Sequence, residues 1–342
     1  MKAEKYGLVD RFVLIRNGRL VADENFDRDY QALRKTIALE DLQSPNAPYE
    51  QYDYDNPDYH PYFRGMQLHT LQSVTTSVTS AALGVAIDQG LIAGTTVPVM
   101  DYLRDDAQDD SDPRKGAITL GDLLTMRSGI AWKTDGGYEE GHSTVTKEDS
   151  AAWIQFILNQ PMDEQPGTSS EYNDGASVLI GKVLSEATGM RAYEWARQQL
   201  FEPIVIDEFH WKITPDGETD TEGGLFLTAH DLARVAYLFL RGGEWNGDRV
   251  LSSDWFARSV TPIVSETWKG GPAYGYQWWV PEHDDGRANV YVGNGYGGQY
   301  LLVFPEHDIV AVVMGWTLRG DYGSAENALR TTILPEAVAI NE

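Results

Sequence analysis

The 342-residue sequence contains no cysteine. Disulfides, thiolate metal sites and cysteine nucleophiles are therefore excluded. The sequence also has no uninterrupted apolar run of membrane length, and its first ten residues, MKAEKYGLVD, lack the apolar segment of a signal peptide. We predict a soluble protein that is cytoplasmic, or periplasmic or secreted if a signal peptide has been removed.

Positive charge is also scarce. Lys and Arg number 27 against 52 Asp and Glu, which gives a formal net charge of -25. Such a surface repels nucleic acids and anionic membranes, so we expect neither as a partner. Aromatic residues are plentiful, with 10 Trp, 18 Tyr and 10 Phe, and 42% of the chain is hydrophobic. The chain can therefore build a large core, in one domain or in two that pack closely.

No pattern in the sequence indicates a metal or cofactor. The seven histidines have no HExxH or clustered spacing. The acidic stretch 105–112 lacks the ligand spacing of a calcium loop. The glycine-rich run 293–298 is not part of a strand-then-helix unit, so it is not a nucleotide-binding fingerprint. We predict no metal and no cofactor.

Residues 71–80, LQSVTTSVTS, lead into the apolar stretch AALGVAIDQGLI. The apolar spacing predicts a helix that ends at Gly90, opened by a run of small hydroxyl residues. A serine at a helix N-terminus lies near unpaired N–H groups and the positive end of the dipole, which favour a developing oxyanion. Serine and threonine are also ordinary N-cap residues, so a capping role stays open for the same residues.

The rest of the chain divides into strands at its ends and helices in its middle. Asn17-Gly18 between 11–16 and 19–22 is typical of a type I′ hairpin. Short turns between the C-terminal strands make them antiparallel. The expected strands there are 274–280, 290–292, 299–304 and 309–314. The expected helices include 118–129 (with Thr119 as N-cap and Gly129 as C-cap), one that follows Tyr172, and a closing helix over 323–340. The tyrosine-rich stretch 41–63 is read as irregular.

This order predicts an α/β protein of the α+β type. Its antiparallel sheet is built from both chain ends and flanked by helices, with a mostly helical insertion. We place the sheet domain at 1–95 and 245–342 and the helical domain at 96–244, with a cleft between them.

Four segments together resemble one family. They are Ser73-Val-Thr-Thr76, residues 118–129 (ITLGDLLTMRSG), Tyr172-Asn-Asp174 and Gly293-Asn-Gly295. The chain is similar to the serine β-lactamase and penicillin-binding-protein superfamily, and most similar to its class C-type esterase and 6-aminohexanoate-oligomer hydrolase branch. The resemblance implies a β-lactamase/transpeptidase-like fold and hydrolysis of a small ester or amide through an acyl-serine.

The resemblance also implies roles for individual residues. Ser73 would be the nucleophile, and Tyr172 would share the acid and base role. Backbone N–H groups of Ser73 and of a residue after Gly295 would hold the oxyanion. The residues expected to bind substrate are Tyr138, Asp174, Gly295, Tyr296 and Gly298. Simpler interpretations remain: Tyr172 as a buried tyrosine, the glycine run as a bulge or close strand approach, and Trp278 and Trp279 as core rather than pocket wall.

The chain departs from the family at three positions. Thr76 replaces the lysine that lies one turn after the serine, Asp174 replaces an asparagine, and Gly293 replaces a lysine or histidine. A neutral Thr76 hydroxyl cannot help to deprotonate Ser73. The substitution is compatible with an engineered trap, with a natural ligand-binding pseudoenzyme, or with another base such as Tyr172 or Lys212. We predict a slow serine hydrolase, with a pseudoenzyme as the alternative; the substrate and oligomeric state stay open.

Overall fold

The computed structural model describes residues 7–26, 66–107, 112–133, 142–265, 267, 271–281 and 290–316. Three predicted features lie outside these residues: the tyrosine-rich stretch 41–63, the substrate-binding role of Tyr138, and the closing helix 323–340.

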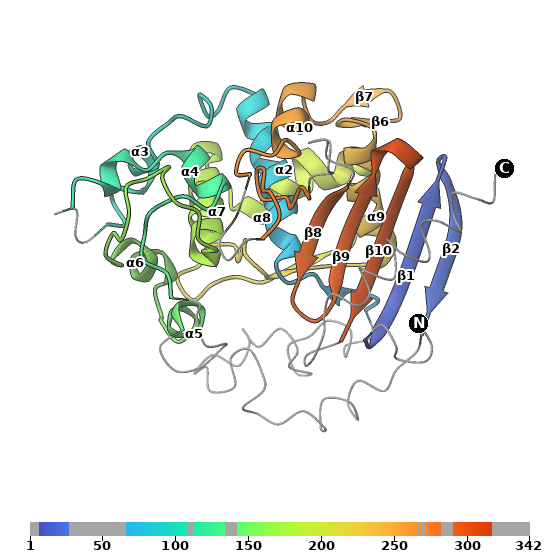
Figure 1. Cartoon of the computed structure of the whole chain (residues 1–342), viewed down its shortest axis with the longest axis horizontal. Coiled ribbons are helices and arrows are strands. Elements are labelled where there is room, and N and C mark those ends of the chain that lie inside the picture. The colour runs from blue at the N-terminus through green and yellow to red at the C-terminus, as the bar shows by residue number, and fades with distance from the viewer. Residues whose placement is uncertain are drawn as a thin grey trace.

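A five-stranded antiparallel sheet has the order β2-β1-β10-β9-β8 (Figure 1). Its strands are β1 (Val9–Arg16), β2 (Arg19–Asn25), β8 (Tyr291–Gly295), β9 (Gln299–Phe304) and β10 (Ile309–Gly315). Because β1 pairs with β10, the prediction of a sheet built from both chain ends is confirmed. Asn17 and Gly18 have φ values of 49° and 69°, as a type I′ hairpin requires.

Helices fill the middle of the chain, as predicted. They are α2 (Val74–Asp88), α3 (Met100–Leu103), α4 (Leu120–Leu124), α5 (Ser143–Glu148), α6 (Trp153–Leu158), α7 (Asp174–Thr188), α8 (Ala192–Ala196), α9 (Ala229–Leu240) and α10 (Ser253–Ser259). The short strands β3 (His69–Thr70), β5 (Leu225–Leu227) and β4 (His210–Trp211) form a second sheet in the order β3-β5-β4. A third pair joins β6 (Glu244–Trp245) to β7 (Asp248–Arg249).

Helix α2 lies at the junction of the sheet and the helices (Figure 1). It packs against α7 and α8 on one side and against β8 and β9 on the other. All its residues from Val74 to Ala86 are buried, so its hydroxyl run is part of the interior. Helix α9, which the sequence assigned to the helical range, packs against β1, β9 and β10. The domain boundaries themselves stay a prediction.

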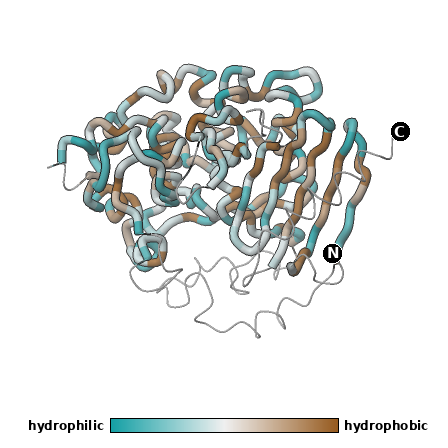
Figure 2. Tube along the Cα trace, viewed as in Figure 1, coloured by the Kyte–Doolittle hydropathy of each residue, from teal (hydrophilic) through white to brown (hydrophobic). Residues whose placement is uncertain are grey.

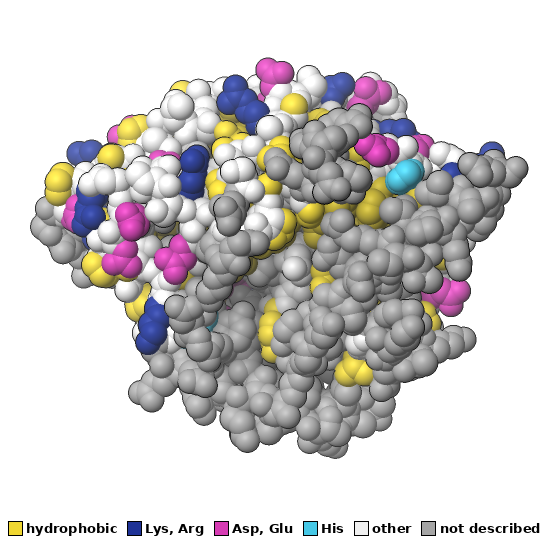
Figure 3. Space-filling view, in the orientation of Figure 1, with side chains coloured by type: hydrophobic (Ala, Val, Ile, Leu, Met, Phe, Trp, Pro, Cys, Tyr) yellow, Lys and Arg dark blue, Asp and Glu magenta, His cyan; other side chains and the backbone are white. Residues whose placement is uncertain are grey.

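Hydropathy follows the layers. Hydrophobic residues concentrate along β9 and β10, whereas the edge strand β2 is largely hydrophilic (Figure 2). Every residue of β9 and β10 is buried, which is expected of strands covered on both faces. On the face seen in Figure 3, described side chains of both charges spread over the helical end, and hydrophobic side chains gather near the centre. No helix in the described part of the chain is long and apolar enough to span a membrane.

Two sequence predictions of secondary structure are wrong. Residues 274–280 form isolated bridges instead of a strand, because Gln277 has φ of 63° and turns the chain. The helix predicted over 118–129 begins as expected after the Thr119 cap but ends at Leu124. Its predicted C-cap, Gly129, lies beyond that end and has φ of 73°.

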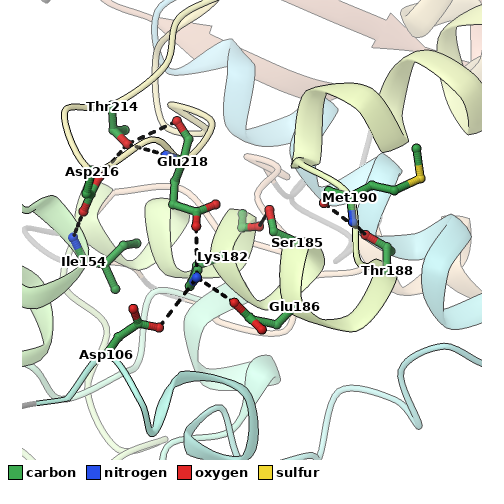
Figure 4. A network of polar contacts seen from close by, with 11 residues as sticks. Asp106, Ile154, Lys182, Ser185, Glu186, Thr188, Met190, Thr214, Asp216 and Glu218 are labelled. Carbon is green, nitrogen blue, oxygen red and sulfur yellow. Dashed lines mark hydrogen bonds and ion pairs between the residues drawn. The ribbon is translucent and has the colours of Figure 1, made fainter.

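A polar network ties α7 to the loops around it (Figure 4). The Lys182 ammonium lies 2.6 Å from Glu186, 2.9 Å from Glu218 and 3.8 Å from Asp106. These contacts join α7 to the loop 214–218 and to the segment after α3. The network therefore helps to hold α7 in place.

Candidate active site

Ser73 follows a strained residue. Gln72 is buried and has φ of 50°, a left-handed conformation that is uncommon outside glycine. Ser73 is the N-cap residue of α2, yet its side chain makes no capping hydrogen bond. The Ser73 hydroxyl therefore does not cap α2 and has a different partner.

That partner is Tyr172. The Ser73 hydroxyl and the Tyr172 phenol are hydrogen-bonded to each other. Burial is the main reason that the pKa of Tyr172 lies above its usual value, and the charges of Asp174 and Glu222 act in the same direction. The Ser73 hydrogen bond and the Lys147 ammonium act against that rise.

Local sequence explains the position of Tyr172. The Asn173 side chain caps α7 by accepting a hydrogen bond from the Ala176 N–H, at 3.0 Å. This cap starts the helix directly after Tyr172 and so places the tyrosine just before the first turn of α7.

The Thr76 hydroxyl has hydrogen-bond partners other than the Ser73 hydroxyl. Its hydroxyl donates to the Ser73 carbonyl oxygen at 2.9 Å and is also hydrogen-bonded to the buried phenol of Tyr274. Because a carbonyl can only accept, Thr76 spends its one proton on Ser73 O. The Thr76 hydroxyl therefore has no proton left to offer the Ser73 hydroxyl. Tyr274 comes from the segment predicted to be a strand, and sequence reasoning gave it no role in the site.

Strand β8 lies directly against the start of α2. A Cβ on Gly295 would meet the Leu71 carbonyl oxygen at 2.4 Å, and one on Gly293 would meet Val74 at 3.2 Å and Ser77 at 3.4 Å. Only glycine permits this approach at Gly295. The glycine motif and the nucleophile segment, which are more than 200 residues apart in the sequence, are therefore adjacent.

The loop after Gly295 closes the hairpin between β8 and β9. Gly297 and Gly298 have φ values of 81° and 90°, which favour glycine. The Gln299 side chain braces the loop by donating to the carbonyl oxygens of Tyr296 at 3.2 Å and Gly315 at 2.6 Å. The substrate-binding roles of Gly295, Tyr296 and Gly298 stay predictions, as does the choice of N–H that would complete an oxyanion hole.

Asp174 is held by protein groups. One carboxylate oxygen accepts from the Trp132 indole N–H at 2.6 Å and the Thr144 hydroxyl at 2.9 Å, and the other lies 3.1 Å from the Lys147 ammonium. Burial alone would raise the pKa of Asp174, but Lys147 and the hydrogen bonds outweigh it and hold that pKa well below its usual value. That Asp174 binds substrate remains a prediction.

Lys147 also contacts Glu222, so the site contains a buried cluster of Lys147, Asp174 and Glu222. Sequence analysis missed Lys147 and Glu222. They come from α5 and from the loop before β5, and neither lies in a motif with a recognisable spacing.

Lys212 and Trp278, which the sequence analysis also considered, each lie against an aromatic ring. The Lys212 ammonium lies 5.5 Å from the centre of the Phe226 ring, and its charge acts on Glu148. Trp278 is fully buried with its ring 4.4 Å from that of Phe239, which is a core position. In the described part of the chain, no group of three or more His, Asp or Glu side chains is arranged to hold a metal ion.

Comparisons with known proteins show which family the sequence matches. A family model described as Beta-lactamase matches residues 61–331. A 6-aminohexanoate-dimer hydrolase from Paenarthrobacter ureafaciens is 28% identical over 265 residues, which cover 71% of this chain and 65% of that protein. The chain thus spans slightly less than two thirds of that relative's length.

Solved structures show the same fold. A putative 6-aminohexanoate-dimer hydrolase from Bacillus anthracis has a TM-score of 0.74 at 18% identity, covering 99% of this chain and 81% of that one. A penicillin-binding protein from Bacillus halodurans has a TM-score of 0.68 at 16% identity, covering 96% and 98%. The β-lactamase/transpeptidase-like fold predicted from the sequence is confirmed.

Proposed function

Because the chain belongs to the beta-lactamase family, we propose that it is a serine hydrolase that cleaves small esters or amides through an acyl-Ser73 intermediate. The observation that carries this proposal is the hydrogen bond between the Ser73 hydroxyl and the Tyr172 phenol. It gives the serine a partner that can exchange a proton with it, which an acyl transfer by serine requires.

The proposed reaction has two halves. Ser73 Oγ attacks the acyl carbonyl while its proton passes to the ionised phenol of Tyr172, and backbone N–H groups at Ser73 and after Gly295 hold the oxyanion. The tetrahedral intermediate collapses, Tyr172 returns the proton to the leaving alcohol or amine, and Ser73 is left acylated. Water then attacks the acyl carbon by the same route in reverse and frees Ser73.

This arrangement supports a slow reaction. The burial that raises the pKa of Tyr172 leaves little phenolate at neutral pH, and Thr76 has no charge with which to favour it. We expect the rate of ester hydrolysis to climb with pH and to reach no plateau below the usual tyrosine pKa of about 10. In Tyr172→Phe, the increase in rate with pH should be no larger than the background increase measured with Ser73→Ala.

Thr76→Lys tests the proposal directly. A lysine one helical turn after Ser73 would supply the missing positive charge, so we expect hydrolysis of p-nitrophenyl esters to rise by about 10²-fold, in the range that one acid–base group contributes. The 6-aminohexanoate dimer serves as an amide probe, since a relative is named for its hydrolysis. Steady-state assays of the unmodified chain, Thr76→Lys and Thr76→Lys/Ser73→Ala measure the effect. No gain with Thr76→Lys would contradict the hydrolase proposal.

A second candidate is a ligand-binding pseudoenzyme on the same scaffold. The neutral Thr76 favours it, because α2 then offers Ser73 no cationic neighbour. In that case Ser73 would never be acylated, in the unmodified chain or in Thr76→Lys.

A further inference from the structure

The ammonium of Lys147 lies at the centre of the buried cluster. Its side chain is 0% exposed, 3.1 Å from Asp174 Oδ2, in contact with Glu222 Oε1, and 4.4 Å from the centre of the Trp153 ring. A buried ammonium persists only where opposite charges and hydrogen bonds replace water. The two carboxyl groups and the indole face provide that environment for Lys147.

The Lys147 ammonium forms an ion pair with the Asp174 carboxylate. Burial would lower the pKa of Lys147, but Asp174, Glu222 and Glu148 outweigh it and raise that pKa, so the lysine stays protonated. Asp174 is ionised, whereas burial and the Asp174 charge raise the pKa of Glu222 well above its usual value. Glu222 therefore holds its proton more tightly than a glutamate in water does.

The cluster adjoins the proposed acid–base group. Tyr172 is two residues from Asp174, and the groups whose charges act on it are Asp174, Glu222 and Lys147. Both carboxyl groups oppose ionisation of the phenol, and Lys147 favours it. Among the charged groups of the described structure that act on the pKa of Tyr172, Lys147 is thus the cation that opposes the effect of the two acids.

We propose that Lys147 is a positioning residue for the Ser73–Tyr172 pair. The buried ammonium of Lys147 neutralises Asp174 and so supplies, from α5, the positive charge that Thr76 does not supply from α2. The inference rests on the proposed function, since it concerns the same proton transfer. It assigns to this chain a cation on α5 in place of one that lies a helical turn after Ser73 on α2.

The test compares three proteins for the rate at which a fluorophosphonate labels Ser73, measured by mass spectrometry over a range of pH. Lys147→Met leaves Asp174 uncompensated, so we expect labelling to slow by about tenfold or more at each pH. Lys147→Met/Asp174→Asn removes both charges, and we expect it to recover most of the lost rate. Lys182→Met is the matched control, because it removes a lysine from the ion-pair network on α7 in Figure 4 and should leave the pH profile unchanged.

The outcomes separate electrostatics from packing. If the double variant is as slow as Lys147→Met, Lys147 acts through packing and the inference is overturned. If Lys147→Met labels as fast as the unmodified chain, the inference is overturned as well. An unmodified chain and a Thr76→Lys variant that are both unlabelled would instead contradict the proposed function itself.

Asp174→Asn keeps the test decisive if Lys147→Met does not fold. In this variant Lys147 retains Glu222 as its partner. Because the change removes a carboxylate that opposes ionisation of Tyr172, we expect labelling to be faster than in the unmodified chain. Slower labelling would mean that Asp174 and Lys147 serve only to hold the structure together.

Discussion

Glu148, beside Lys147 in the sequence, shows how far single residues depend on their surroundings. It is fully buried, and neither carboxylate oxygen has a hydrogen-bond partner in the described part of the structure. Burial raises the pKa of Glu148 well above its usual value; Asp174 and Asp220 add to the rise, and Lys147 and Lys212 oppose it. Glu148 therefore holds its proton more tightly in the folded protein than a glutamate in water does.

This pKa makes stability depend on pH. A raised folded-state pKa means that the folded chain holds the proton more tightly than the unfolded chain. The contribution is complete below the usual glutamate pKa of about 4.3 and is lost as pH rises toward the folded-state value. The folded protein should therefore lose stability from this group between mildly acidic and alkaline pH.

Glu148→Gln removes the titration and keeps the shape. Because the raised pKa of Glu148 costs the folded protein more stability as pH rises, we expect the advantage of the variant over the unmodified chain to be larger at about pH 8 than at about pH 5. Urea unfolding at both pH values measures the gain. Glu24→Gln, an exposed change on β2, is the control and should show none. An equal effect of Glu148→Gln at both pH values would refute the assignment.

At this scale the motif residues were predictable and their supporting residues were not. Ser73 and Tyr172 stand in short segments whose residue types and spacing indicate their chemistry, and the structure brings them into one hydrogen bond. Lys147, Glu222 and Tyr274 come from separate parts of the chain. Only the folded arrangement of α5, the loop before β5 and the turn before Gln277 brings them to the site, so no local pattern could indicate them.

Among the elements, the contact between β8 and α2 decides the shape of the site. The contact depends on Gly295, whose missing side chain leaves room for the carbonyl oxygen of Leu71. Gln72, between Leu71 and Ser73, would also lie 3.1 Å from a Cβ at this position. Any side chain there must push the strand away from the nucleophile segment.

We therefore expect Gly295→Ala to reduce both stability and reactivity. Overpacking against backbone costs about 1–3 kcal/mol, and the displaced strand should lower Ser73 labelling by about tenfold or more. Gly116→Ala is the matched control, since a Cβ there meets no heavy atom within 4 Å. Urea unfolding and fluorophosphonate labelling measure the two effects. A Gly295→Ala variant as reactive as the unmodified chain would show that β8 does not shape the site.

Across the whole molecule, the sheet followed from strand patterns at the two ends of the chain. The apolar runs in β9 and β10 were sufficient, because a short continuous apolar run between turns is typical of a strand buried on both faces. The failure at 274–280 has a tertiary cause. Gln277 is held in its left-handed turn by the Ser77 hydroxyl, which donates to its carbonyl at 2.7 Å, and by its own amide, which donates to Leu123 and Leu124. These partners are remote in sequence, so the strand-like composition of the segment was misleading.

The most direct measurement of the central claim is mass spectrometry of the intact protein and its peptides after exposure to a fluorophosphonate and to a p-nitrophenyl ester. The account predicts a slow adduct on the peptide that carries Ser73, absent from Ser73→Ala. It also predicts an ester-derived acyl group that lasts longer in the unmodified chain than in Thr76→Lys. An unlabelled Ser73 in both the unmodified chain and Thr76→Lys would contradict it and would leave a binding protein on a hydrolase scaffold.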